Sequence, residues 1–363
     1  MPMIEATGES TSTSRPGPTI ARLPDRRPAE PAGAAARRSG ASSEQTVVAQ
    51  ELGKRFGENV VIQGLSFDVQ RGTIFGVIGP SGCGKTTTVR MLLGVTRPSS
   101  GKLHVLGREP HKFRRSDRER LGYMPQQFVL FPELSVSENM GFAASIYGMS
   151  FWGRGKRIRR TLELVELWDA RNRPAGQLSG GMQRRLELAA TLVHDPDVIF
   201  LDEPTAGIDP VLRAKFWDHF RALRDDGRTL IVTTQYVTES EYCDEILVLK
   251  DGQKVATGTP EDVRKAAMGG EIVTVAGADL SSHAVAVIRA VEGVKSVSWA
   301  ARDRLDVVVE DAGSSVPVLL DALRAANIEV EEVSEQHASF DDVFVKLMAE
   351  DRGVGGSSAQ ANR

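Results

Sequence analysis

The spacing of apolar residues divides the chain into a folded part and flanking segments of different composition. From about residue 45 onward, apolar and polar side chains alternate, notably through residues 60–69, which is typical of strands with one buried face. The run Thr73–Ile78 is apolar almost throughout and predicts a strand buried on both faces. Short apolar runs and helical segments, punctuated by glycine and proline, then continue to about Met268. This order predicts an α/β domain over residues 45–268.

A second, smaller unit follows the pair Gly269-Gly270, which marks a domain boundary. Residues 271–350 have the pattern strand, helix, two strands joined by a charged turn at residues 302–304, helix, strand and helix, which predicts a small α+β domain. Phe340 and Phe344 lie one helical turn apart, so we expect them to hold the last helix against the small sheet.

The two ends of the chain lack such patterns. Residues 1–44 are rich in proline, serine, alanine, glycine and arginine and nearly free of large apolar side chains. Such a segment cannot bury enough surface to offset the entropy lost on ordering. We therefore expect a disordered N-terminal tail over residues 1–44 and a second disordered tail over residues 351–363.

Composition narrows the classes of function. The net charge of −3 provides no general basic field, so nucleic acid is not an expected partner. The chain has 2 cysteines, Cys83 and Cys243, which argues for a reducing compartment rather than a disulfide framework. No apolar run reaches the roughly 18–20 residues that span a bilayer, so we expect any membrane association to occur through another chain or through the protein surface.

The first chemical motif follows the strand Thr73–Ile78 directly and has the pattern G-x-x-x-x-G-K-[ST]. Glycines are required there because the backbone must curl until successive N–H groups point at phosphates, and the following helix adds the positive end of its dipole. Lys85 is expected to reach the β- and γ-phosphates of a nucleotide, and the Thr86 hydroxyl to ligate Mg²⁺. The residues of this loop are Gly79, Pro80, Ser81, Gly82, Cys83, Gly84, Lys85, Thr86 and Thr87.

The second motif, LSGGMQ at residues 178–183, precedes a helical stretch. Ser179 is expected to cap this helix, and the two glycines that follow free its first N–H groups, which predicts a second anion-binding helix terminus. One ATP cannot occupy both termini within one subunit. The residues that we assign to this terminus are Ser179, Gly180, Gly181 and Gln183.

The third motif is the apolar run 198–201, which ends in Asp202 and Glu203. This pattern predicts a buried strand with two carboxylates at its end, beside the phosphate loop. Asp202 is expected to hold Mg²⁺ through water, and Glu203 to act as the general base that polarises the attacking water.

Together the three motifs resemble the Walker A loop, the signature and the Walker B strand of the nucleotide-binding domain of ABC transporters. The resemblance covers roughly residues 45–268. It implies an α/β P-loop NTPase fold, with a RecA-like core, a β-subdomain and a helical subdomain. It also implies ATP and Mg²⁺ as cofactors, hydrolysis of ATP, and a head-to-tail dimer in which the signature of one subunit contacts the ATP of the other.

Other residues stand at functional positions of that family. Phe56 stands where the family has an aromatic residue that stacks on adenine, and Asp209 lies in a segment that resembles the D-loop. Gln126 matches the glutamine that ligates Mg²⁺ and relays the nucleotide state to the membrane partner. Residues 126–149 resemble the helical subdomain that receives this partner. The apolar residues that could contact the partner, or instead pack in the core, are Phe128, Phe131, Phe142, Tyr147, Phe151 and Trp152.

One position departs from the family pattern, because Gln235 replaces the switch histidine. A glutamine amide can donate a hydrogen bond to a γ-phosphate oxygen, but it carries no charge and does not titrate. Since charge-assisted hydrogen bonds are roughly twice as strong as neutral ones, we expect a working but slow catalytic site of Glu203, Lys85 and Gln235. The alternatives are a degenerate site paired with a more active subunit, and a nucleotide sensor without catalysis.

The end of the small domain identifies a branch of the family. Residues 339–344, SFDDVF, resemble the corresponding segment of ATPases that serve ABC-2 type exporters, including pumps of the daunorubicin-resistance type. The resemblance implies export of a drug, lipid or glycan, with a link to antibiotic resistance. The implied partners are a separate ABC-2 permease, which holds the subunit at the cytoplasmic face of the cell membrane, and a second nucleotide-binding subunit of the same or a related kind.

A rival class comprises ABC ATPases that act on ribosomes or DNA. Ribosome-acting members generally carry two cassettes, and chromosome-type members insert long coiled coils between the Walker A loop and the signature. This chain has one cassette, and about 95 residues without heptads lie between those motifs. The pattern therefore favours the transporter class.

Overall fold

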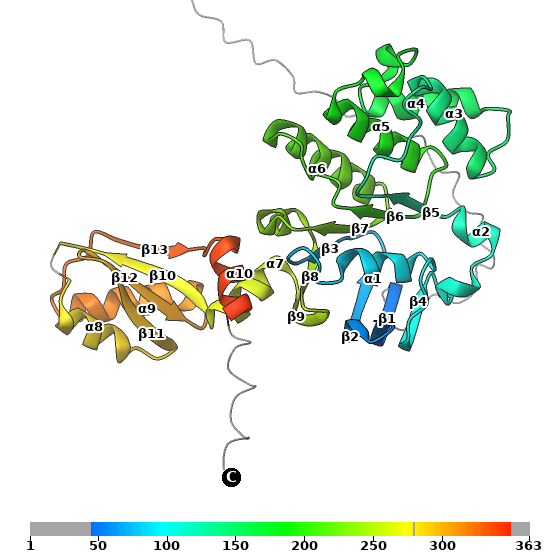
Figure 1. Cartoon of the computed structure of the whole chain (residues 1–363). Coiled ribbons are helices and arrows are strands. Elements are labelled where there is room, and N and C mark those ends of the chain that lie inside the picture. The colour runs from blue at the N-terminus through cyan, green and yellow to red at the C-terminus, as the bar shows by residue number, and fades with distance from the viewer. Residues whose placement is uncertain (1–44, 279, 350–363) are drawn as a thin grey trace, which may run out of the picture.

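The computed structural model describes residues 45–278 and 280–349, which form a larger unit built on two sheets and a smaller unit built on one (Figure 1). The tails expected over residues 1–44 and 351–363 lie outside the described residues.

A six-stranded sheet with the order β5-β6-β7-β3-β8-β9 forms the centre of the larger unit. Its strands pair in parallel except β9, which runs antiparallel to β8. Every residue of β3 is buried, as expected for a parallel strand covered on both faces. Since the carboxyl ends of parallel strands lie at one edge of a sheet, the loops after β6, β7 and β3 come together there. The strands are β3 Ile74–Ile78, β5 Leu121–Met124, β6 Val198–Asp202, β7 Thr229–Thr234, β8 Glu245–Lys250 and β9 Gln253–Gly258.

A three-stranded antiparallel sheet with the order β2-β1-β4 covers one side of this centre. Strands β1 and β2 form a hairpin whose tip places Phe56 opposite Asn59. One core cluster joins this sheet with α1 and the facing side of β3, and it includes Leu52, Met91 and Phe75. The elements here are β1 Gln45–Phe56, β2 Asn59–Gln70, α1 Lys85–Leu92, β4 Ser100–Val105, η1 Pro110–Lys112 and α2 Arg115–Arg118.

Helices cover the other side. α3, α4 and α5 lie together as a helical layer at one end of the larger unit, and α6 packs against β7 and β3 (Figure 1). A second core cluster joins these helices to the central sheet through fully buried residues such as Met140, Leu186 and Trp217. The elements are α3 Val136–Ile146, α4 Arg154–Leu164, η2 Trp168–Ala170, η3 Ala175–Gln177, α5 Gly180–Leu192, α6 Pro210–Asp225, η4 Val237–Tyr242 and α7 Pro260–Met268. Across residues 45–278 and 280–349, no helix has the length and apolar character that a membrane crossing requires.

The smaller unit is an antiparallel sheet with the order β11-β12-β10-β13, and its helices α8 and α9 pack on this sheet. Its elements follow the predicted order, and the βαββαβ arrangement with this strand order is the split βαβ of ferredoxin-like folds. Its core is a separate cluster that includes Val275, Ile288 and Leu319. The elements are β10 Glu271–Ala276, α8 Ser282–Arg289, β11 Val294–Ala301, β12 Arg304–Val309, α9 Ala312–Ala325 and β13 Glu332–Gln336.

The last helix, α10 (Phe340–Ala349), packs against α7 and η4 of the larger unit (Figure 1). Phe340 is buried in the cluster that also contains residues of α6 and β7, and Phe344 packs against that cluster. The prediction that these two phenylalanines hold the helix on the small sheet is therefore wrong. Their spacing indicates that the helix buries one face, but it carries no information about the surface that covers this face.

Polar contacts fasten both ends of α10. The Arg264 guanidinium of α7 donates a hydrogen bond to the Ala338 carbonyl at 3.0 Å and lies 4.6 Å from the centre of the Phe340 ring. At the far end, Lys250 Nζ donates to the Met348 carbonyl at 2.8 Å. The chain thus leaves the larger unit after α7 and returns to it at α10.

Replacing Phe340 by alanine is expected to lower the free energy of unfolding by about 3–5 kcal/mol, because it removes a buried aromatic side chain from a packed core. Val345 of the same helix is 69% exposed, so Val345→Ala is a matched control that should change stability by less than about 0.5 kcal/mol. Denaturant titration followed by tryptophan fluorescence measures both. Equal effects of the two substitutions would contradict the docking of α10 on the larger unit.

Candidate functional site

The loop between β3 and α1 has the curled backbone that its glycine pattern predicts. Gly82 and Gly84 have φ values of 83° and 108°, in the left-handed region that favours glycine. A Cβ at Gly79 would lie 2.3 Å from the Leu249 carbonyl oxygen, so a larger residue does not fit there. Helix α1 begins at Lys85, and its free N–H groups therefore face the loop.

Lys85 connects this loop with the end of β6. Its buried ammonium donates to the carbonyl oxygens of Gly79 at 2.8 Å and Pro80 at 3.1 Å, and it lies 3.4 Å from Glu203 Oε1. A buried cation needs such partners to offset the loss of hydration. Burial raises the pKa of the nearby Cys83 thiol, although the positive charge of Lys85 opposes this shift, so Cys83 packs beneath the loop as a neutral side chain.

Asp202 ends β6 and accepts two hydrogen bonds at one carboxylate oxygen. The Thr86 hydroxyl donates to Oδ1 at 3.2 Å and the Thr233 hydroxyl donates to it at 2.6 Å. Oxygen ligands from one hydroxyl and one carboxylate, completed by water and phosphate oxygens, are the set that Mg²⁺ favours in nucleotide sites. The oxygen ligands of Thr86 and Asp202, which lie beside the phosphate loop, therefore fit Mg²⁺.

The sequence interpretation missed Thr233. This residue is directly opposite Asp202 in the parallel pairing of β6 and β7, and its hydroxyl also accepts the Glu203 N–H at 3.0 Å. The sequence did contain one sign of this role, because Thr233 is a polar residue at the end of the apolar strand β7. Its partner could be identified only once the order of the strands was known.

Glu203 occupies the turn after β6 and has a φ of 49°. A left-handed conformation in a residue other than glycine costs about 1–3 kcal/mol and persists only where the surroundings hold it. Its carboxylate accepts a hydrogen bond from Gln126 Nε2 at 2.8 Å and faces Lys85. The structure therefore brings together Lys85, Gln126 and Glu203, three of the residues selected from the sequence.

Gln235 follows β7 and lies beside the phosphate loop. Its Oε1 accepts a hydrogen bond from the Ser81 hydroxyl at 3.0 Å, and the preceding Thr234 carbonyl accepts the Gly79 N–H at 3.4 Å. The side chain is exposed, so its amide has room to turn toward a ligand on the loop.

The signature lies at the start of α5 in the helical layer. Ser179 caps the helix by accepting the Met182 N–H at 3.4 Å, and both Ser179 and Gly180 are exposed. Gln183 is engaged internally, because its Nε2 donates to the Ala175 carbonyl at 3.2 Å. In the part of the chain that the structure describes, no hydrogen bond or ion pair joins residues 178–183 to the phosphate loop.

Two further predicted residues also lie apart from the loop. Phe56 is 52% exposed at the tip of the β1–β2 hairpin, with the Lys54 ammonium 4.6 Å from the centre of its ring. Asp209 caps α6 by accepting the Leu212 N–H at 2.9 Å. Phe56 thus offers an open aromatic face, and the Asp209 carboxylate has a structural partner.

Comparison with known families matches both units. Residues 62–206 match the family described as ABC transporter. Residues 258–348 match the family described as ATP-binding protein DrrA1-3-like, C-terminal domain. The second match includes both the small sheet and α10.

The chain is also similar in sequence to subunits of transporters. Nod factor export ATP-binding protein I of Ralstonia nicotianae is 41% identical over 242 residues, which are 66% of this chain and 75% of that protein. The probable multidrug ABC transporter ATP-binding protein YbhF of Escherichia coli is 39% identical over 225 residues, which are 62% of this chain and only 39% of that protein.

Solved structures agree with the fold and support the assignment. The cbiO1 subunit of Clostridium perfringens, part of the ABC transporter complex cbiONQ, has a TM-score of 0.57 at 27% identity, covering 61% of this chain and 90% of that chain. A bacterial Atm1-family ABC exporter with ATP bound has a TM-score of 0.55 at 26% identity, covering 61% of this chain and 40% of that chain. The chain therefore belongs to the ABC transporter family, as an ATP-binding and ATP-hydrolysing subunit of the ABC-2 type exporter branch.

Proposed function

We propose that the chain binds Mg-ATP at the sheet edge formed by β3, β6 and β7, and that two such subunits close head to tail on the nucleotide. The observation that carries this proposal is the separation of two anion-binding helix ends. The end of α1 carries the phosphate loop, whereas the exposed Ser179 and Gly180 at the start of α5 have no bond to that loop in their own subunit. A two-fold arrangement lets the signature of one subunit complete the site of the other.

Within each site, Glu203 acts as the general base for the attacking water, and Lys85 binds the β- and γ-phosphates. Both side chains are buried, and Lys85 Nζ lies 3.4 Å from Glu203 Oε1. This supports the proposal, because the base and the phosphate-binding ammonium are then next to each other. Thr86, Asp202 and Gln126 hold Mg²⁺, which neutralises charge on the transferred phosphoryl group when bound.

Residues at the periphery of the site contact the adenine, the γ-phosphate and the neighbouring subunit. Phe56 stacks on the adenine through its exposed ring, and Gln235 donates a hydrogen bond to the γ-phosphate from its place beside Ser81. Asp209 contacts the neighbouring subunit next to its cap on α6. Gln183 completes the signature that faces the ATP of the other subunit, and its hydrogen bond to the Ala175 carbonyl holds its side chain at the start of α5.

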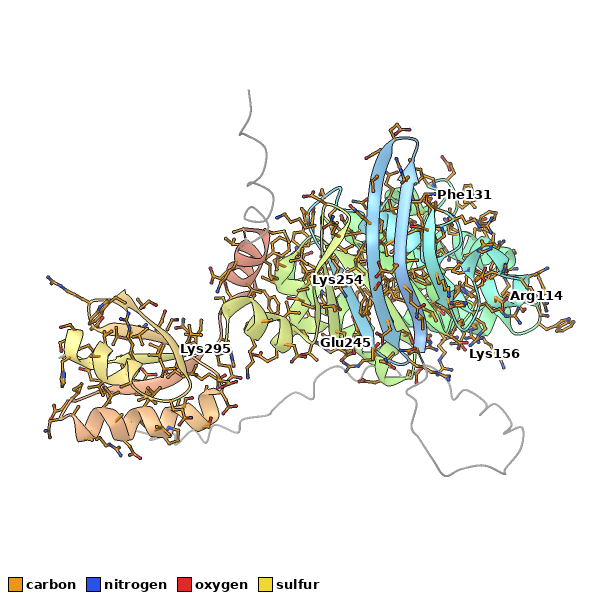
Figure 2. The ribbon with its side chains drawn as sticks, turned by 90° about the horizontal axis from the view of Figure 1, so that it is seen from below. Arg114, Phe131, Lys156, Glu245, Lys254 and Lys295 are labelled. Carbon is orange, nitrogen blue, oxygen red and sulfur yellow. The ribbon has the colours of Figure 1, made fainter. Side chains whose placement is uncertain are left out.

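The helical layer binds an ABC-2 permease at the cytoplasmic face of the membrane. Phe131 and Phe142 are 42% and 44% exposed and pack edge to face with ring centres 4.8 Å apart, and Phe151 and Trp152 are 87% and 91% exposed. Phe131 lies at the end of the molecule remote from Lys295 of the small domain (Figure 2). An exposed apolar group of this kind is typical of a docking surface.

The two other candidates for this surface pack within the subunit. Phe128 lies against the core cluster, and the ring of Tyr147 stacks on His194 with ring centres 3.5 Å apart. The permease surface that we propose therefore consists of Phe131, Phe142, Phe151 and Trp152. Relatives named for Nod factor export and for multidrug transport support a drug, lipid or glycan as the exported substrate.

Glu203→Gln is expected to bind ATP like the parent and to hydrolyse it about 10²–10⁴-fold more slowly, because the amide cannot accept the proton of water. Light scattering of the variant with saturating Mg-ATP should show a dimer. Lys85→Ala should remain monomeric, because it lacks the ammonium group that binds the phosphates of ATP. Unchanged turnover would contradict the role of Glu203. A monomer in the presence of Mg-ATP and any partner subunit would contradict the shared site.

Gln235→His is expected to raise turnover by about two- to tenfold, since a charged imidazole makes a stronger hydrogen bond to phosphate than a neutral amide. Steady-state phosphate release measures the change, and Gln235→Ala, which has no donor, should be slower than the parent. A large loss of turnover in the histidine variant would refute the prediction.

Thr233→Val keeps the shape of the side chain but removes the hydrogen bond to Asp202, a contact to a charged group worth about 1.5–3 kcal/mol. We expect the Mg²⁺ concentration at half-maximal turnover to rise by about tenfold or more, because the carboxylate loses its support. The control is Thr257→Val, at an exposed position of β9. Parent-like Mg²⁺ dependence of the Thr233 variant would show that this hydroxyl does not position Asp202.

A further inference from the structure

Arg184 of α5 is a buried arginine whose donors reach two other segments of the chain and a glutamate of its own helix. Its Nη2 donates to the Glu203 carbonyl at 2.7 Å, and its Nε donates to the Pro204 carbonyl at 3.1 Å. Its Nη1 donates to the Pro125 carbonyl at 2.9 Å and to Glu187 Oε2 at 2.7 Å. Only 8% of the residue is exposed, so these bonds replace the hydration that the guanidinium loses. The planar fork of arginine can serve several acceptors at once, which a lysine ammonium on one flexible stem cannot reproduce.

One of these acceptors belongs to the strained residue of the site. Glu203 has a left-handed backbone, and its N–H is held by the hydroxyl and the carbonyl of Thr233 at 3.0 and 3.1 Å. Arg184 holds the carbonyl on the other side of the same residue. Together the two contacts over-determine the turn, as a conformation of this kind requires. If the Arg184 contact were lost, the turn could relax and move the carboxylate away from Lys85 and Gln126.

The same arginine also holds the segment that carries Gln126. Pro125 immediately precedes this glutamine, and its carbonyl accepts from Arg184. Beyond the glutamine, the Val129 N–H donates to Glu187 Oε1 at 3.3 Å, while the other oxygen of Glu187 pairs with Arg184. Residues 125–129 are thus bound on both sides by two side chains of one helical turn of α5.

We propose that Arg184, supported by Glu187, is a positioning residue for ATP hydrolysis that sets the place of Glu203 and of the segment carrying Gln126 as one unit. This inference rests on the proposed role of Glu203 as the general base. Helix α5 begins at the signature, so a tilt of the helical layer displaces Arg184 and, through it, the base of the same subunit. The helical layer thereby controls hydrolysis in its own site, in addition to contributing its signature to the site of the partner.

The first test compares Arg184→Met with Arg184→Lys. The methionine variant is expected to lose about 10–100-fold in kcat, the usual cost of a small displacement of catalytic groups, while the KM for ATP changes by less than about threefold. The lysine variant keeps a charge for Glu187 but cannot serve all three carbonyls, so its kcat should lie between those of the parent and the methionine variant. Arg157→Met is the matched control, because Arg157 pairs with Asp195 at 2.6 Å and does not contact Glu203. Parent-like kcat in Arg184→Met would overturn the proposal.

A second measurement separates positioning from folding. Arg184→Met leaves the buried Glu187 without its cation, so Arg184→Met/Glu187→Leu removes both charges from the interior. We expect the melting temperature of this double variant to recover toward that of the parent while kcat stays low. Recovery of kcat together with the melting temperature would show a role in folding alone and would overturn the proposal.

A third measurement asks whether Arg184 acts through Glu203. In a Glu203→Gln background, adding Arg184→Met should lower the residual turnover by much less than the roughly 10–100-fold expected in the parent, because the base, one of the two groups that the arginine positions, is already inactive. Multiplicative losses would show an independent action and would contradict the inference.

If Glu203→Gln alone leaves turnover unchanged, the proposed function fails. If that variant is slow while Arg184→Met matches the parent, only the positioning role fails.

Discussion

The site depends on the parallel register of β6, β7 and β3. Strand β7 lies between the other two and places Thr233 opposite Asp202 and Thr234 opposite Ile78. A strand with buried side chains on its faces cannot slip by one position without exchanging them, so this register is strongly specified. The ends of the three strands therefore hold the phosphate loop, the carboxylates and Gln235 at fixed separations. The charged groups of the site are brought together by apolar packing beneath them rather than by their own attraction.

Strain and burial are concentrated where the helical layer meets this edge. Glu203 adopts a left-handed backbone, and Arg184 and Glu187 form a buried ion pair beside it. A buried ion pair contributes little net stability, but it specifies geometry because each partner is costly to leave alone. This arrangement links α5 to the base and to residues 125–129, which connect the site to the surface proposed for the permease. Movements of the layer and the state of the nucleotide are then coupled through hydrogen bonds to backbone atoms.

Helix α10 brings the end of the smaller unit to the segment that follows Gln235. Helix α10 packs on η4, the turn that follows Gln235, and Arg264 connects α7 to Glu241 of that turn at 3.3 Å. Within η4 the buried Glu239 accepts hydrogen bonds from Thr205 at 2.7 Å and from Thr234 at 2.6 Å. The helices that flank the small sheet, α7 and α10, both contact η4. A movement of the smaller unit would therefore shift the segment that carries Gln235.

The sequence by itself determined the features that depend on local backbone geometry and periodicity. The glycines of the phosphate loop, the cap at Ser179, the apolar strand that ends in Asp202 and Glu203, and the element order of the small domain all follow from residues close together in the chain. Only the tertiary structure decided which surface α10 covers, that Thr233 supports Asp202, and that Arg184 contacts Glu203. In a sequence, Arg184 is one charged residue among several on a helix. Its contacts arise from packing between segments that are distant in the chain, and no local pattern of residues encodes that proximity.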